Sequence, residues 1–397
     1  MLTRAIRIRN RIYELIESQT GLAKIYFASV TNCDRTVSLI HLAKDYYSMS
    51  LMLRHHGNFT EALEAGEKSL ELFCQIFEEN HYTIAESYFN IAWIYKDLGR
   101  YEEARKTFDK VLRSLQEECD VEGSSLSLKN TSRSMLLLGS TLVEQGRVHL
   151  QISQYGQALE YQLRALEVTE QVIGSKHSRV GTICNNLAIS YGCKWEFDLA
   201  ITYTKRALKI RRKKLGPEHQ YVANSICALV QFKFLKGYYS ESDEPANLFE
   251  QLEEAERIYS LAGSMKLLSL YFIKGRILHA NRSWEQAVYW STKALELAEQ
   301  HSSTSILLKS YYVMNLAALL YDKGSMESNE QDIERAVSLA QQAQDIRLTQ
   351  LVAYHPDVFL GDTILDTFKS RQNPYKLTGF HLTQCISVSM LLVYLAA

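Results

Sequence analysis

The feature that most constrains this chain is a helical hairpin of mostly small and apolar residues. Between residues 177 and 219, two successive stretches place such residues at steps of three or four, which is the spacing of one face of an α-helix. The first stretch contains Ile183, Leu187, Ala188 and Tyr191, and the second contains Phe197, Ala200, Thr204 and Ala207. One hairpin cannot bury its apolar face alone, so the pattern predicts that the hairpin repeats.

The hairpin recurs along the chain at a nearly constant period. With the turn between its two helices as a phase marker, the equivalent residues are Gly57, Gly99, Ser153, Trp195, Gly237, Arg282 and Gly324. Successive markers are 42, 54, 42, 42, 45 and 42 residues apart. An aromatic ring stands two residues after every marker except the last, where Met326 replaces it, and small residues recur five after and seven before. This arrangement resembles the tetratricopeptide repeat, whose pattern has small and aromatic residues at those offsets.

The repeat predicts the fold class: an all-α, right-handed superhelical solenoid of about seven antiparallel helical hairpins. Small residues of the two helices, among them Ala104, Ala158, Ala200 and Ala207, are expected to be buried where helices touch. With 397 residues but only 4 Pro and 18 Gly, the chain has few helix breakers. A solenoid needs no single large core, because each repeat packs only on its neighbours.

Composition also bounds the partners and the compartment. A formal net charge of −1 gives no whole-chain electrostatic case for binding nucleic acid or an anionic membrane. The 7 cysteines lie scattered without a CxxC pair, and no secretory signal opens the sequence. We therefore expect reduced thiols and a cytoplasmic location.

The pattern predicts three regions. Residues 1–35 form a helical lead-in, interpreted as the remnant of a repeat because residues 4–9 (RAIRIR) parallel residues 206–211 (RALKIR). Residues 36–358 form the solenoid, and residues 359–397 hold a degenerate eighth repeat and an apolar tail. The predicted units span residues 40–77, 84–119, 135–173, 178–214, 221–260, 265–300 and 305–352. Alternatives for the opening residues are a fragment of a longer protein, a truncated gene product and an Arg-rich mitochondrial presequence.

Several irregularities interrupt the period. A polar loop over residues 120–130 accounts for the gap of 54 residues. Pro245 falls where the second helix of the fifth unit should begin, so that helix is expected to start near Asn247. In the seventh unit, residues 325–334 (SMESNEQDIE) are predicted to lie between the two helices. His355 and Pro356 are expected to open the eighth first helix.

The last 21 residues contain no Asp, Glu, Lys or Arg. Residues 377–397 are long enough to span a membrane, yet Gly379, His381 and Gln384 dilute their hydropathy. One interpretation is a terminal helix that caps the exposed end of the solenoid. The other is a C-terminal membrane anchor flanked by Lys369, Arg371 and Lys376.

No motif indicates catalysis. His81, His177, His219 and His355 each occupy the same place ahead of a first helix. Stacked repeats would hold them about one repeat apart, too far to share a metal ion. No HExxH, GxSxG or P-loop pattern is present. We therefore expect neither enzyme activity nor a cofactor or metal.

The densest basic cluster lies in residues 205–214. Its cations are expected to complement the helix dipole before Gly216 and Pro217 end the helix. Nuclear localisation or nucleic-acid binding is the alternative.

The repeats also resemble one subtype of tetratricopeptide repeat, that of kinesin light chains. Their length of 42 residues, residues 215–219 (LGPEH) followed by Val222 and Ala223, and residues 184–188 (CNNLA) followed by Tyr191 carry the resemblance. It covers roughly residues 40–358. The heptad-rich helix with which kinesin light chains bind the motor's heavy chain is missing from this sequence. In the subtype, first-helix asparagines on the concave face grip an extended peptide, and the resemblance implies a protein-binding role.

We therefore expect a non-enzymatic scaffold or adaptor that binds a peptide or partner protein in a concave groove. Alternatives are a kinesin-light-chain-like cargo adaptor, a tail-anchored membrane receptor, and the interaction arm of a larger signalling protein or enzyme. The predicted peptide-binding residues lie on first helices next to the small packing residue: Asn90, Trp93, Arg147, Asn185, Asn186, Arg276 and Asn315. They favour an acidic, aromatic-containing partner. The alternative is that the asparagines only tie adjacent repeats together, and Glu144 in the third unit already breaks a uniform groove.

Overall fold

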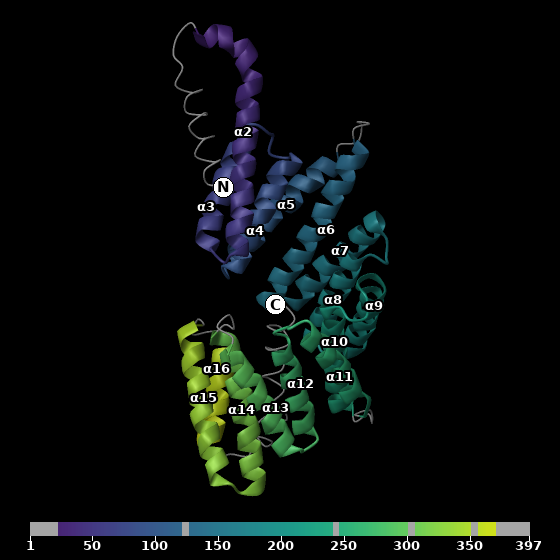
Figure 1. Ribbon diagram of the computed structural model, residues 1–397, viewed down its shortest axis with the longest axis vertical. Coiled ribbons are helices and arrows are strands. Elements are labelled where there is room, and N and C mark those ends of the chain that lie inside the picture. The colour runs from purple at the N-terminus through teal and green to yellow at the C-terminus, as the bar shows by residue number, and fades with distance from the viewer. Residues whose placement is uncertain (1–22, 121–126, 241–245, 301–305, 351–355, 371–397) are drawn as a thin grey trace. The chain divides into compact units, whose positions relative to one another are not determined.

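The computed structural model describes residues 23–120, 127–240, 246–300, 306–350 and 356–370 (Figure 1). Every regular element in these ranges is an α-helix, and successive helices pair into hairpins, so the predicted all-α solenoid class is confirmed. The chain divides into two compact units, Met1–Ser175 and Lys176–Ala397, each described here by itself.

Three hairpins make up the described part of the first unit. Its helices are α2 (Ala23–His55), α3 (Phe59–Cys74), α4 (Tyr82–Asp97), α5 (Tyr101–Asp120), α6 (Ser127–Gln151) and α7 (Tyr155–Ile173). Each even-numbered helix is the first helix of a hairpin and packs on the odd-numbered helix that follows it. The second helix of one hairpin then contacts the first helix of the next, as in α3–α4 and α5–α6.

The second unit continues the same alternation. Its helices are α8 (Ser178–Cys193), α9 (Phe197–Leu215), α10 (Gln220–Ser240), α11 (Ala246–Leu261), α12 (Leu267–Ala280), α13 (Trp284–Gln300), α14 (Ile306–Glu327), α15 (Glu330–Gln350) and α16 (Pro356–Lys369). α16 packs on α15. One continuous apolar core runs through this unit from Val222 to Phe368.

Five of the seven predicted turn markers are the turns themselves. The backbone has a positive φ at Gly57 (81°), Gly99 (74°), Ser153 (60°), Trp195 (66°) and Arg282 (58°). This left-handed conformation ends the first helix and reverses the chain. Three of these positions carry a side chain in a conformation that glycine adopts at lower cost.

The other two predicted turns are wrong. Gly237 lies inside α10, which continues to Ser240, and Gly324 lies inside α14, which continues to Glu327. The turn between α14 and α15 has its positive φ at Ser328 (55°). Most of residues 325–334 therefore extend the two helices, because nothing in them forces a break before Ser328.

Small residues set the distance between helices, as predicted. Ala104, Ala158, Ala200 and Ala207 are fully buried. Gly146 on α6 is a tighter case, because a Cβ there would lie 3.1 Å from the carbonyl oxygen of Ala158 on α7. Larger side chains at these positions would push the helices apart.

The helix boundaries modify other expectations. α2 is continuous from Ala23 to His55, so the described part of the expected lead-in belongs to the first hairpin's helix. α6 begins at Ser127, which makes residues 127–130 helical rather than part of the expected loop. α11 begins at Ala246, one residue before the predicted start. Residues 371–397, with the tail, lie outside the described residues; within the described ones no helix is long and apolar enough to cross a membrane.

The repeated histidines cap helices. His81, His177 and His219 each accept, at Nδ1, a hydrogen bond from the backbone N–H two residues later, over 3.1 to 3.2 Å. This bond satisfies one of the amides that a helix start leaves without a partner. The predicted single structural slot is confirmed for these three, while His355 lies outside the described residues.

Candidate functional site

The candidate site lies on the first helices of the first unit. We call it the tryptophan cluster, which consists of Arg54 from α2, Asn90, Trp93 and Lys96 from α4, and Glu144 and Arg147 from α6. First helices two apart in the chain contact one another here, α2 with α4 and α4 with α6. The hairpin stack therefore brings side chains from three repeats onto one face.

Trp93 is at the centre of the cluster. The guanidinium carbon of Arg54 lies 4.7 Å from the indole ring centroid, and the ammonium nitrogen of Lys96 lies 3.8 Å from it. Both distances are within the range of cation–π attraction. The indole N–H is buried, and no acceptor for it is present in the described part of the chain. A buried donor without an acceptor is destabilising, because it has lost its hydrogen bonds to water and forms none within the protein.

Two cations share one carboxylate beside the indole. Lys96 Nζ lies 2.6 Å from Glu144 Oε2, and Arg147 Nη1 lies 3.4 Å from Glu144 Oε1. The Lys96 and Glu144 side chains are only 11% and 8% exposed. Burial lowers the pKa of Lys96, and the nearby Glu144 carboxylate opposes this shift. Asp97 also interacts electrostatically with Arg54, Lys96 and Arg147. Three cationic side chains thus face two carboxylates, those of Glu144 and Asp97.

Asn90 connects neighbouring repeats. Its amide nitrogen donates to the Ser50 hydroxyl over 2.9 Å, and its oxygen accepts from Arg54 Nη1 over 3.3 Å. Ser50 in turn donates to the carbonyl of Ala62. These bonds join α4 to the first hairpin and position the Arg54 side chain next to Trp93. Asn90 is 2% exposed, so its described partners are internal.

The remaining predicted site residues lie in the second unit and are buried. Asn186 on α8 is 7% exposed, and Asn315 on α14 is 1% exposed and donates weakly to Ser291 over 3.4 Å. Asn185 accepts from Arg211 Nη1 over 3.3 Å. Arg276 lies near the Phe272 ring, with its guanidinium carbon 5.8 Å from the centroid. None of these contacts joins the four predicted residues to one another.

Two members of the cluster were not predicted from the sequence, Arg54 and Lys96. Each stands three residues before its turn marker, Gly57 and Gly99, so a search for charges that recur in phase would have found them. A cation at this phase on successive repeats reaches the same side of the next first helix.

Only part of the basic segment at the end of α9 lies where the helix-dipole interpretation places it. Arg212, Lys213 and Lys214 occupy the last turn of α9, before Gly216 at φ 91°. Arg211, predicted as part of that cluster, is instead 5% exposed and donates to the Ser225 hydroxyl and the Tyr221 carbonyl.

Comparisons with known proteins identify the repeats. The tetratricopeptide repeat family matches residues 43–117 and 137–213. The first segment holds the end of α2, all of α3 and α4 and most of α5, and the second holds most of α6, all of α7 and α8 and most of α9. The hairpins in these two segments are of the tetratricopeptide-repeat type. A second family, described as anaphase-promoting complex subunit 5, matches residues 271–359.

Two curated relatives extend the tetratricopeptide match. Human "Tetratricopeptide repeat protein 19, mitochondrial" is 26% identical over 173 residues, which are 42% of this chain and 46% of the relative. "Protein KINESIN LIGHT CHAIN-RELATED 1" of Arabidopsis thaliana is 25% identical over 257 residues, 64% of this chain and 39% of the relative. The chain thus spans less than half the length of both relatives. The predicted similarity to kinesin-light-chain-type repeats is confirmed by the second.

A solved structure supports the fold. The crystal structure of aspartyl phosphate phosphatase F from Bacillus subtilis has a TM-score of 0.57, with 12% identity, over 84% of this chain and 77% of the phosphatase. At this identity the likeness concerns the arrangement of helices alone.

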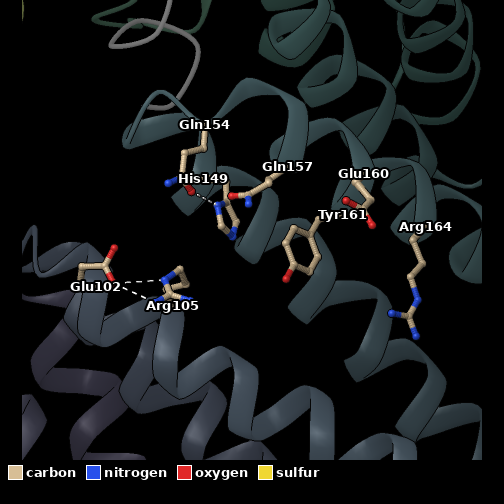
Figure 2. Close-up of a pocket in the computed structure, with 8 residues that line it drawn as sticks. All are labelled: Glu102, Arg105, His149, Gln154, Gln157, Glu160, Tyr161 and Arg164. Atoms are coloured by element: carbon tan, nitrogen blue, oxygen red, sulfur yellow. Dashed lines mark hydrogen bonds and ion pairs between the residues drawn. The ribbon is translucent and has the colours of Figure 1, made fainter.

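The first unit also has a cleft between α5 and α7, beside the end of α6. It is a polar cleft of about 390 Å³ lined by Glu102, Arg105, His149, Gln154, Gln157, Glu160, Tyr161 and Arg164 (Figure 2). Arg105 is held by Glu102 over 3.0 Å, and His149 Nδ1 lies 2.7 Å from the Gln154 oxygen. The His149 ring also stacks on Tyr161, with centroids 5.1 Å apart. The polar groups are thus bound mainly to one another, and they offer no paired nucleophile and base.

The described residues hold no group of three or more His, Cys, Asp or Glu side chains placed for a metal ion. The side chains of Cys184, Cys193 and Cys227 are buried, and burial raises the pKa of the Cys193 thiol to about 12. A thiol with so high a pKa is a poor nucleophile at neutral pH.

Proposed function

We propose that this tetratricopeptide repeat protein is a non-enzymatic adaptor whose tryptophan cluster binds a peptide segment of a partner protein. The observation that carries the proposal is the buried Trp93 N–H, which has two cations beside it and no acceptor in the described chain. A ligand carbonyl or carboxylate would satisfy this donor and gain from the cations at once.

The chemistry of the cluster favours an acidic ligand. Arg54, Lys96 and Arg147 together carry one positive charge more than the carboxylates of Glu144 and Asp97 balance. Arg147 is the most accessible of the ion-paired groups, with 29% of its side chain exposed. An aromatic side chain on the ligand would find the guanidinium planes of Arg54 and Arg147 suited to stacking. We therefore expect acidic peptides that contain an aromatic residue.

Cargo binding of the kinesin-light-chain kind is the second candidate function. It is favoured by the similarity to the Arabidopsis relative, which covers 64% of this chain. The compartment stays a separate proposal: we expect a cytoplasmic protein, while the human relative is named mitochondrial. Fractionation of cells that express the tagged chain would decide between the two.

A peptide selection tests the proposed site. A displayed library of random peptides would be panned on the full chain, and the affinities of selected peptides would be measured with wild type and with Arg147→Glu. Reversing this charge removes a charge-assisted hydrogen bond and adds repulsion, so binding should weaken by about tenfold or more. Arg113→Glu on the exposed face of α5 is the control, because it makes the same charge change outside the cluster. Selected peptides that bind Arg147→Glu as tightly as wild type would overturn the proposal.

A further inference from the structure

The sixth hairpin is formed by α12 and α13 (Figure 1). It holds three aromatic rings around one lysine. The Nζ of Lys293 lies 4.9 Å from the ring centroid of Tyr271, 4.9 Å from that of Trp290 and 5.9 Å from that of Tyr289. All three distances fall within cation–π range. No carboxylate of the described residues lies within ion-pair distance of Lys293. The ammonium group therefore has rings, not an acid, as its neighbours.

The three rings contact one another, with Tyr271 tilted against Trp290 and Tyr289 edge-on to it. The Tyr271 and Trp290 centroids are 5.0 Å apart with their planes at 39°, and Tyr289 meets Trp290 at 5.3 Å and 78°. Tyr271 is 8% exposed and hydrogen-bonded to Glu256, so its position is fixed by the interior. Tyr289 is 58% exposed and forms the outer wall. The group is thus anchored on one side and open to solvent on the other.

The first two hairpins show which part of this ring group belongs to ordinary repeat packing. A tyrosine and a lysine 22 residues later make the same contact in the first two hairpins, Tyr46 with Lys68 at 5.9 Å and Tyr88 with Lys110 at 5.2 Å. A lysine of the second helix that lies over a tyrosine ring of the first helix is therefore a recurrent contact within a hairpin. Only the sixth hairpin adds Tyr289 and Trp290, where the second has Lys106 and Thr107. The two extra rings are not required by the repeat.

We propose that Tyr271, Tyr289 and Trp290 form an aromatic cage for an alkylated ammonium group, and that Lys293 occupies the cage until such a ligand replaces it. A primary ammonium group is compact and strongly hydrated, so it gains less from the rings than an alkylated cation does. The methyl groups of such a cation also bury apolar surface against the rings. Lys293 has a flexible four-carbon stem and is only partly buried, so it is able to leave towards solvent.

The cage is electrostatically prepared for a cation. Lys274 lies 4.5 Å from the Trp290 centroid, but its charge is balanced by Glu256 at 2.5 Å. The Glu256 carboxylate also interacts with the Tyr271 hydroxyl, whose pKa is raised by burial and then by this carboxylate. Tyr271 therefore stays neutral at physiological pH, and its ring presents an uncharged π-face. The cage is separate from the tryptophan cluster, and its test is independent of the proposed peptide site.

Small cations provide the test with the full chain labelled with ¹⁵N-tryptophan. The 4 tryptophans give few indole signals, and the Trp290 signal reports on the cage. Nα-acetyl-Nε-trimethyl-lysine amide and phosphocholine would be titrated into wild type and Lys293→Ala, with acetyl-lysine amide and an uncharged tert-butyl analogue as ligand controls. We expect Lys293→Ala to bind one or both cations about tenfold more tightly than wild type. The cation that binds more tightly identifies the source, a methylated protein or a choline headgroup.

Two variants make the result specific. Tyr289→Leu in the Lys293→Ala background should abolish the gain, and because Tyr289 is mostly exposed this change should leave the melting temperature nearly unchanged. Lys110→Ala, which uncovers the single ring of Tyr88, should create no binding. The proposal is overturned if Lys293→Ala leaves the Trp290 signal unmoved by both cations. Binding of the tert-butyl analogue as tight as that of the cations would also overturn it, because the site would then recognise apolar groups rather than positive charge.

Discussion

Buried side chains of this protein fall into two groups that respond to substitution in opposite ways. The alanines at helix contacts are fully buried and tolerate no larger side chain without movement of the helices, whereas buried polar residues such as Asn90 and Arg211 depend on particular hydrogen-bond partners. Arg211 illustrates the second case, since burial lowers the pKa of its guanidinium to about 10 although three oxygen acceptors surround it. Its hydrogen bonds offset only part of the cost of removing a charge from water.

Ala200→Leu tests the packing at single-residue scale. Ala200 is fully buried where α9 meets α8, and overpacking of this kind costs about 1 to 3 kcal/mol. For a unit of this size, each kcal/mol lowers the melting temperature by about 2 to 4 °C. Thr202→Leu, exposed on the same helix, is the control and should change it little. An unchanged melting temperature for Ala200→Leu would contradict the packing phase of the repeats.

Single residues also show where sequence analysis reaches its limit at the candidate site. The phase of the repeat placed Trp93 and Arg147 near each other, since each stands one residue after a small packing residue. It also selected Asn90, but the phase does not reveal that Ser50 and Arg54 occupy its amide. The aromatic cage was not predicted either, because long side chains such as Lys293 have directions that spacing alone does not fix.

At the scale of elements, the hairpin turn decides where each repeat begins. The sequence period predicted the turns at Gly57, Gly99, Ser153, Trp195 and Arg282 because the aromatic ring and alanine that follow them must face the first helix. It misplaced those at Gly237 and Gly324, because those first helices continue for more than one extra residue. The spacing of small and apolar residues identifies the packed face of a helix. It does not show at which residue the helix ends, because the same face continues when the helix is longer.

A pair of turn variants should change stability in opposite directions. Ser153 has φ 60° and is exposed, so Ser153→Gly should stabilise the first unit by about 1 kcal/mol because it relieves a left-handed conformation. Gly99 has φ 74° with nothing near its missing Cβ, so Gly99→Ala should destabilise by about the same amount through backbone strain alone. Urea unfolding of both variants measures the two shifts. Shifts of the same sign would show that the left-handed backbone does not govern these turns.

At the scale of the whole molecule, each repeat is stabilised by packing on its neighbours. Within each unit, every described helix contacts the helices next to it in the chain, so a repeat at an end of a unit has one face that no other described repeat of that unit covers. In the second unit the last described helix, α16, packs on α15, and Phe359 and Leu348 remain 76% and 52% exposed. Large apolar side chains at an end of a solenoid call for a cover, and residues 377–397 are the apolar segment that follows in the sequence.

Removal of residues 377–397 distinguishes the two interpretations of that segment. If it caps the end of the second unit, the truncated chain should stay folded but exchange its amide hydrogens faster in α15 and α16, with α8 and α9 unaffected, because coupling between repeats weakens with each intervening hairpin. If it anchors the chain, the full-length protein should sediment with membranes and the truncated one should not, while exchange in α16 stays the same. Measuring both properties on both chains is therefore decisive. Full-length protein that stays out of the membrane fraction, together with unchanged exchange in α15 and α16, would contradict cap and anchor alike.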